Sequence, residues 1–264
     1  MKIVLFTDSL GAGGAQRQLC GLALYLKQSG YDVLVCTYFN LDFYKTMLDE
    51  NGIANELIPD AACAGGRLIA VRKYFKHHNP DWVIAYQETP SLVSCVAKLL
   101  GAKFRLLVSE RNTTQRLTIR DRIRFNLYRF ADAIIPNSYS QGDYIVGRYP
   151  WMHAKCFVIS NFVDIKEFYP SNKDRGDIPK FLIVGSISEP KNTKRLIEAC
   201  RILKAKGVKV CINWYGWTDS PSSYMLECSN MISQYDLAEY ITFQNKQLNI
   251  SSKYQYFVKN LTII

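Results

Sequence analysis

The sequence predicts an α/β protein with two doubly wound parallel sheets, the second of them incomplete. An apolar run at Lys2–Phe6 leads into Gly11–Gly14 and a helical pattern, and a similar run at Phe181–Val184 leads through Gly185 and Ser186 into another. A strand, a glycine turn and a helix in this order are typical of the start of a nucleotide-binding domain. Short apolar strands that alternate with helices predict parallel sheets buried on both faces.

The predicted elements divide the chain into a first domain, residues 1–168, a linker, residues 169–179, and a second domain, residues 180–264. The linker is polar and contains proline. Apolar runs predict strands at Lys2–Thr7, Asp32–Thr37, Ala54–Ile58, Trp82–Tyr86, Phe104–Ser109, Ala133–Pro136, Cys156–Ile159, Phe181–Val184, Val208–Tyr215 and Tyr240–Gln244. Helical spacing of apolar residues predicts helices through Ala15–Leu26, Leu92–Leu100, Ile119–Phe130, Thr193–Lys206 and Ser222–Tyr235.

The composition is typical of a cytoplasmic globular protein. Of the 264 residues 48% are hydrophobic, enough for a sizeable core. The apolar run after Met1 is broken by Asp8, so we expect no signal peptide, and no run reaches the roughly 18 apolar residues of a membrane-spanning helix. The eight cysteines are scattered, with no C-x-x-C and no clustering with histidine. They favour reduced thiols over disulfides or a metal site.

The net charge of +10 is concentrated in one arginine-rich segment. Its arginines are Arg111, Arg116, Arg120, Arg122, Arg124 and Arg129, and its apolar residues Ile119, Ile123, Leu127 and Phe130 recur at helical spacing. One interpretation is a solvated basic face over a packed apolar face. The other is attraction of Arg116, Arg120 and Arg124 to a phosphorylated ligand or to an anionic membrane surface, which would place the protein at the inner face of the cell membrane. Nucleic acid is disfavoured because no recognised binding motif accompanies the arginines.

The first glycine turn is a candidate phosphate-binding loop. Gly13 and Gly14 would let backbone N–H groups approach an anion at the start of a helix. A nicotinamide-dinucleotide site would need a glycine at position 16 and an acidic residue at the end of the second strand. Position 16 is Gln16, and the second strand ends in Thr37–Asn40. A dinucleotide enzyme is therefore disfavoured, while a purely structural tight turn stays open.

Four motifs, in order along nearly the whole chain, resemble the retaining GT-B glycosyltransferases. They are Gly13–Arg17, Ala131–Ser138, Val158–Asp164, and Val184–Asn192 with the following Leu196–Ala199. More narrowly, they resemble the family 4-like members of the bacterial branch that builds cell-surface polysaccharides and lipid-linked precursors. The resemblance implies two Rossmann-like domains, a nucleotide-sugar donor, a glycan or lipid-phosphate-linked acceptor, and transfer with the anomeric configuration kept. The sequence contains no Asp-x-Asp pair, which agrees with a site that uses neither a metal nor a cofactor.

The resemblance also implies site residues. Lys191 matches the family lysine that contacts the donor diphosphate, beside Gly185, and Ser186 stands where relatives carry an arginine. Gly13 and Gly14 match the loop that faces the donor phosphates. Relatives carry a sugar-contacting histidine near Glu110 and Asn112, and either of these residues could replace it. The alternatives are that Lys191 is an ordinary exposed lysine and that Glu110 and Arg111 are exposed loop charges.

The end of the chain leaves two interpretations of its activity. Family members carry a Glu-x7-Glu segment that positions the donor, and we expect this truncated chain to stop before it. The first interpretation is a glycosyltransferase whose activity as a separate chain is in doubt. The second is a non-catalytic remnant or a binding subunit that retains the acceptor-side domain.

Overall fold

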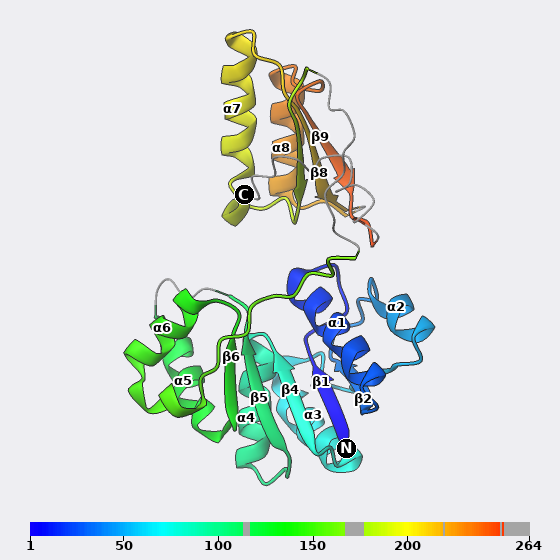
Figure 1. Cartoon of the computed structure of the whole chain (residues 1–264), viewed down its shortest axis with the longest axis vertical. Coiled ribbons are helices and arrows are strands. Elements are labelled where there is room, and N and C mark those ends of the chain that lie inside the picture. Colours follow the sequence, from blue (N-terminus) through cyan, green and yellow to red (C-terminus); the bar gives the residue numbers. More distant parts are fainter. Residues whose placement is uncertain (113–116, 167–176, 219, 249, 251–264) are drawn as a thin grey trace. The chain divides into compact units, whose positions relative to one another are not determined.

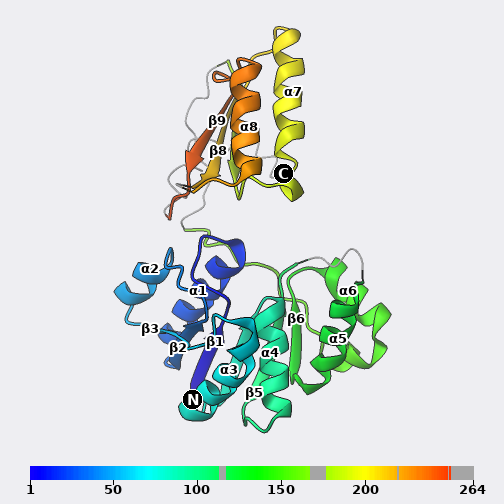
Figure 2. The ribbon, with the colours of Figure 1, turned by 180° about the vertical axis from the view of Figure 1, so that it is seen from behind.

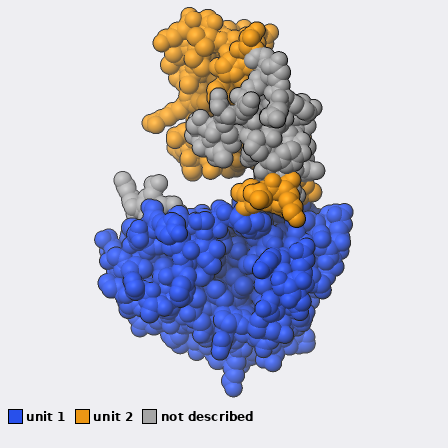
Figure 3. Space-filling model, viewed as in Figure 1, with its two compact units in different colours: residues 1–162 blue, residues 163–264 orange. Residues whose placement is uncertain are grey.

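The protein consists of two compact units, residues 1–162 (unit 1) and residues 163–264 (unit 2), which Figure 3 colours separately. A computed structural model describes residues 1–112, 117–166, 177–218, 220–248 and 250. The predicted domain boundary at residue 168 and most of the predicted linker lie outside the described residues.

Unit 1 is built around a six-stranded parallel sheet. Its strands are β1 (Lys2–Phe6), β2 (Asp32–Thr37), β3 (Ala54–Leu57), β4 (Trp82–Tyr86), β5 (Arg105–Glu110) and β6 (Ala133–Pro136). They pair in the order β3-β2-β1-β4-β5-β6, and each pairing is parallel. The order reverses between β1 and β4. The carboxyl ends of these two strands are therefore the topological switch point, where open α/β sheets bind their ligands.

Helices cover both faces of this sheet. They are α1 (Gly14–Gln28), α2 (Lys45–Glu50), α3 (Ala64–His78), α4 (Glu88–Leu99), α5 (Ile119–Leu127) and α6 (Tyr139–Arg148), with the 3₁₀ turns η1 (Tyr128–Phe130) and η2 (Pro150–Lys155). Because side chains alternate along β1, Val4 and Phe6 enter one core with α3 to α6, while Ile3 and Leu5 enter a second core with α1 and α2. Figure 1 labels the α-helices, and the view from behind in Figure 2 brings α3 and α4 in front of the strands.

Unit 2 contains a smaller parallel sheet with helices packed on it. Its elements are β7 (Lys180–Val184), the 3₁₀ turn η3 (Glu189–Lys191), α7 (Thr193–Ala205), β8 (Cys211–Trp217), α8 (Ser223–Gln234) and β9 (Ile241–Asn245). The strands pair in the order β7-β8-β9. Ile197 of α7 and Met225 of α8 are buried with Ile212 and Trp214 of β8 in one core. No helix in the described parts of either unit is long and apolar enough to span a bilayer.

Most predicted elements are confirmed, and one strand is wrong. The segment Cys156–Ile159 forms only an isolated bridge between Cys156 and Ile134, although the N–H groups of Phe157 and Ile159 still donate to β6 carbonyls. Phe157 and Ile159 are exposed, so this edge segment lacks the burial that its apolar composition suggested. Strand β8 also starts at Cys211 and not at Val208, because the Val208 N–H donates to the Leu203 carbonyl and closes helix α7.

Candidate functional site

The glycine turn after β1 leads directly into helix α1. Gly13 is the N-cap of α1, and a Cβ at this position would collide with the Gln16 carboxamide, which folds back over it. Gly14 has open space around its Cα and is exposed. A side chain at position 13 would therefore displace the Gln16 carboxamide, whereas Gly14 leaves the first N–H groups of α1 approachable by a ligand.

A polar network that the sequence analysis missed surrounds Asp8, between β1 and this turn. Asp8 Oδ1 accepts hydrogen bonds from the Ser9 N–H at 2.6 Å and from Gln16 Nε2 at 2.9 Å. The hydroxyls of Thr7 and Ser9 lie 3.3 Å from the same oxygen. An acidic residue placed between a buried strand and a glycine turn was the signal in the sequence that could have identified this carboxylate.

Gln87 joins the network from the end of β4. When its amide is oriented so that donors meet acceptors, Gln87 Nε2 lies 2.9 Å from Asp8 Oδ1 and Gln87 Oε1 accepts from Gln16 Nε2 at 3.2 Å. Gln87 has φ 72° and ψ 174°, a region that is almost restricted to glycine. The carboxyl ends of β1 and β4 are thus linked by side chains at the switch point.

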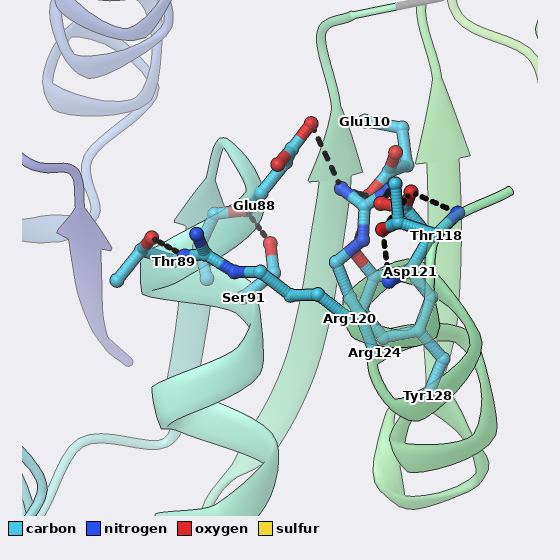
Figure 4. A network of polar contacts seen from close by, with 10 residues as sticks. Glu88, Thr89, Ser91, Glu110, Thr118, Arg120, Asp121, Arg124 and Tyr128 are labelled. Carbon is cyan, nitrogen blue, oxygen red and sulfur yellow. Dashed lines mark hydrogen bonds and ion pairs between the residues drawn. The ribbon is translucent and has the colours of Figure 1, made fainter. Parts of the chain in front are cut away.

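Glu110, at the end of β5, lies in a buried ion cluster (Figure 4). Its Oε1 accepts a hydrogen bond from the Tyr128 hydroxyl and lies 3.2 Å from Arg124 Nη1. The side chain is only 1% exposed, and its Oε2 has no hydrogen-bond partner among the described residues. Burial raises the pKa of Glu110, and Arg124 opposes that rise. In this structure Glu110 is not presented to a ligand, contrary to its predicted contact with sugar hydroxyls.

Arg124 occupies the centre of this cluster. Its Nη1 also lies 3.3 Å from Oε1 of Glu88 in the first turn of α4, and its Nη2 donates to Asp121 Oδ1 at 3.1 Å. Asp121 in turn forms a capping box with Thr118 at the start of α5. One guanidinium therefore connects α4, β5 and α5, the arrangement drawn in Figure 4.

The predicted orientation of the arginine-rich helix is wrong for its isoleucines and correct for Leu127 and Phe130, which pack against the core. Arg124 is only 2% exposed and faces inward, whereas Ile119 and Ile123, which were expected to pack, are 79% and 53% exposed. The inward positions of α5 and η1 are Arg124, Phe125 and Tyr128, because three carboxylates offer the guanidinium partners and the two rings fill the core. Arg124 therefore cannot face a membrane. Arg120 is exposed and donates to the Thr89 hydroxyl at 3.1 Å; Arg116 lies outside the described residues.

Arg111 and Asn112 follow β5, next to the buried Glu110. Arg111 is half-buried, with its guanidinium 4.3 Å from the centre of the Tyr86 ring and its Nη1 donating to Asn161 Oδ1 at 2.9 Å. It is therefore not the exposed loop charge that one interpretation expected. Asn112 is exposed.

In unit 2 the predicted phosphate-binding residues lie in one loop between β7 and α7. Lys191 Cε is 4.0 Å from the position that a Cβ on Gly185 would take, so the lysine side chain extends over this glycine. The Ser186 and Ser188 hydroxyls are 3.3 Å apart. Lys191 is exposed and ends the 3₁₀ turn η3, two residues before the start of α7. Gly185, Ser186 and Lys191 are thus brought together in one loop. The Gly185 N–H donates to the Tyr215 carbonyl, and the Gly185 carbonyl accepts from Trp214 Nε1.

The described ranges of the chain contain no candidate metal site. No group of three or more His, Cys, Asp or Glu side chains there could hold a metal ion. The carboxylates of Glu88, Glu110 and Asp121 converge, but Arg124 occupies the space between them.

Comparison with known proteins gives a family match and one curated relative. Residues 12–167 match the family model described as Glycosyltransferase Family 4. A relative from Campylobacter jejuni is named N-acetylgalactosamine-N,N'-diacetylbacillosaminyl-diphospho-undecaprenol 4-alpha-N-acetylgalactosaminyltransferase, and it is 27% identical over 230 residues. The aligned part is 77% of this chain, and it spans 60% of the length of the relative.

Solved structures of other proteins have a similar fold. HepE from Anabaena, crystallised with UDP-glucose, superimposes with a TM-score of 0.79 and 20% identity over 96% of this chain and 71% of its own. A glycosyltransferase from Rickettsia africae gives a TM-score of 0.73 with 16% identity over 97% of this chain and 70% of its own. Likeness at these identities shows the fold alone. The predicted pair of Rossmann-like, GT-B-like parallel-sheet domains is confirmed.

Proposed function

Because this chain belongs to glycosyltransferase family 4, we propose that it transfers a sugar from a nucleotide-sugar donor to an acceptor hydroxyl. The observation that carries the proposal is the family match, which runs through nearly all of unit 1. The name of the Campylobacter jejuni relative includes a diphospho-undecaprenol acceptor. It supports a lipid-diphosphate-linked glycan as the acceptor class of this chain. The motifs shared with retaining enzymes support transfer with the anomeric configuration kept.

Unit 2 would bind the donor through the loop between β7 and α7. The leaving group is a nucleoside diphosphate, so the departing negative charge must be stabilised in the transition state. The exposed Lys191 ammonium, beside Gly185, offers a charge-assisted contact for this purpose. On this basis we propose that transfer requires no metal ion and no cofactor.

The proposal is tested by a transfer assay on the full chain. Purified protein is incubated with radiolabelled UDP-N-acetylgalactosamine or UDP-glucose and an undecaprenyl-diphosphate-linked disaccharide, with and without EDTA. We expect labelled lipid-linked product, formed at the same rate in EDTA. A folded protein that binds UDP but yields no product with either donor would instead support a non-catalytic binding protein.

Substitution of Lys191 by alanine tests the donor site. We expect the Kd for UDP to rise about fivefold, which corresponds to about 1 kcal/mol, the net contribution of one typical hydrogen bond. Isothermal titration calorimetry with UDP measures this change. Lys206→Ala, at the opposite end of α7, is the matched control and should bind UDP like the wild type. Equal affinities of the Lys191→Ala variant and the wild type would contradict the role of Lys191.

We also propose that the outer face of α5 contacts an anionic membrane surface. Ile119 and Ile123 lie one turn apart and are exposed, and Arg120 and Arg122 are exposed on the same helix. Apolar side chains flanked by arginines are typical of helices that lie in a membrane interface. The apolar residues of α5 would therefore contribute to the contact together with the arginines.

Vesicle co-sedimentation tests this contact. The Ile119→Ser/Ile123→Ser double variant should lose most binding to phosphatidylglycerol-containing vesicles, because two isoleucines would no longer enter the interface. Ile69→Ser, which changes an isoleucine of α3 that is 71% exposed, between the values of Ile119 and Ile123, is the control and should bind like the wild type. If both variants bind as the wild type does, α5 does not contact the membrane.

A further inference from the structure

The two carboxylate oxygens of Asp8 have very different surroundings. The donors within hydrogen-bond distance of Oδ1 are the Ser9 N–H, the hydroxyls of Thr7 and Ser9, and the amide nitrogens of Gln16 and Gln87. Within the described part of the chain, the one hydrogen-bond donor near Oδ2 is Gln87 Nε2 at 3.2 Å, and this nitrogen lies closer to Oδ1, at 2.9 Å. One oxygen is therefore saturated, and the other keeps most of its capacity to accept hydrogen bonds.

The main chain of Asp8 is held as firmly as its side chain. Its carbonyl accepts hydrogen bonds from the N–H groups of Tyr38 at 3.1 Å and of Phe39 at 2.8 Å, both just after β2. Residue 8 is therefore fixed by β1, by the end of β2 and by α1, and the side chain is half-buried at the surface of the sheet edge. A carboxylate held in this way is preorganised, so a ligand would not have to restrain it on binding.

The backbone of Gln87 provides a second, independent observation. A residue other than glycine at φ 72° and ψ 174° costs on the order of 1–3 kcal/mol and persists only where the surrounding structure enforces it. The conformation is held by the Gln87 N–H, which donates to the Ser109 carbonyl of β5 at 3.2 Å, and it directs the side chain to Asp8. Such outliers gather at binding sites, and this one lies at the topological switch point.

The chemistry of the network identifies the kind of ligand. The groups around Asp8 are neutral amides and hydroxyls, and one carboxylate supplies too few ligands for a metal ion. A half-free anionic oxygen beside neutral amides matches a hydroxyl group, which donates to the carboxylate and accepts from an amide. We propose that Asp8 Oδ2 accepts a hydrogen bond from a hydroxyl of the neutral acceptor sugar, and that Gln87 is the positioning residue that orients this carboxylate.

This inference rests on the proposed glycosyl transfer and is tested by binding, which does not require transfer. Saturation-transfer NMR with N-acetylgalactosamine as the probe is performed on the full wild-type chain and on Asp8→Asn. Asparagine keeps the shape and the acceptor at Oδ1 but replaces the anionic Oδ2 with an amide nitrogen. We expect the affinity to fall about tenfold, with the Kd for UDP and the melting temperature unchanged.

Two substitutions of Gln87 separate its positioning role from folding. Gln87→Gly and Gln87→Ala both remove the amide and should both weaken sugar binding severalfold without changing the affinity for UDP. Glycine relieves the backbone cost and alanine does not, so the glycine variant should melt at the higher temperature. In the transfer assay, Gln87→Gly should raise the KM for the acceptor more than it lowers kcat. Asn79→Gly, at a positive-φ residue after α3, is the matched control and should bind the sugar like the wild type.

The outcomes separate this inference from the proposed function. Sugar binding by the wild type that is lost in Asp8→Asn supports the inference even if no transfer is detected. Transfer activity with undiminished sugar binding by Asp8→Asn overturns the inference and leaves the proposed function intact. Absence of any saturation transfer from the wild-type protein to the sugar also overturns it, and so do Gln87 variants that bind the sugar as the wild type does.

Discussion

Replacement of Arg124 by methionine should lower the free energy of unfolding of unit 1 by about 3–5 kcal/mol, because it leaves the Glu110 carboxylate buried without its cation. Arg124 lies within 3.3 Å of carboxylate oxygens from Glu88 and Glu110, and it also bonds Asp121 of its own helix. Removal of the guanidinium would detach α5 from β5 and α4. Urea denaturation followed by hydrogen exchange of the peptides from β5 and α5 measures the loss separately from unit 2.

The partner substitution gives a sharp control for this prediction. Glu110→Gln removes the buried charge while keeping an oxygen that can accept from the Tyr128 hydroxyl. The double variant Arg124→Met/Glu110→Gln should therefore be more stable than Arg124→Met, since removal of both partners leaves no isolated charge in the core. An Arg124→Met protein that unfolds at the wild-type urea concentration would show that the cluster contributes nothing to stability.

Replacement of Gly216 by alanine should destabilise unit 2 by about 1–3 kcal/mol and weaken UDP binding, because the added methyl group collides with the Gly185 carbonyl. The Cβ would also lie 3.0 Å from the Gly185 carbonyl carbon and 3.3 Å from Trp214 Nε1, which donates to that carbonyl at 2.8 Å. Gly216 lies at the irregularity in the pairing of β8 with β9. Any shift of Gly185 would move the backbone over which Lys191 extends.

Gly207→Ala separates the collision from the loss of a glycine. Gly207 has φ +70° and open space around it, so alanine there costs only backbone strain, about 1 kcal/mol. Thermal unfolding and calorimetry with UDP should show the larger loss of stability, and the only loss of affinity, in Gly216→Ala. Equal behaviour of the two variants would contradict the steric argument.

The fold could be predicted from the sequence because its signals are local. The continuous apolar run of β1 and the helical stripe of α1 are consequences of burial, and they marked both elements correctly. The edge segment Cys156–Ile159 was predicted wrongly because it is as apolar as a strand. Its side chains Phe157 and Ile159 are exposed, and exposure depends on which elements cover the edge of β6.

The candidate site could be predicted only in part. The first glycine turn and the Lys191 loop directly follow strands in the sequence. Their position at the carboxyl edges of the parallel sheets could therefore be predicted. The link between Asp8 and Gln87 was not, because it joins residues 79 positions apart through side-chain geometry and a strained backbone. No feature of the printed sequence distinguishes Gly216 from an ordinary strand glycine until the carbonyl of Gly185 lies against it.

The sequence by itself determined the order of strands and helices, the two parallel-sheet units and the family, since repeated burial and short motifs are properties of neighbouring residues. Tertiary structure alone decided which face of α5 turns inward. Helical spacing favoured the isoleucines, but Glu88 and Glu110 approach from α4 and β5 and draw Arg124 into the core. The free energy of burying a charge depends on partners that only folding brings together. A pattern within a single helix therefore cannot show that Arg124 faces inward.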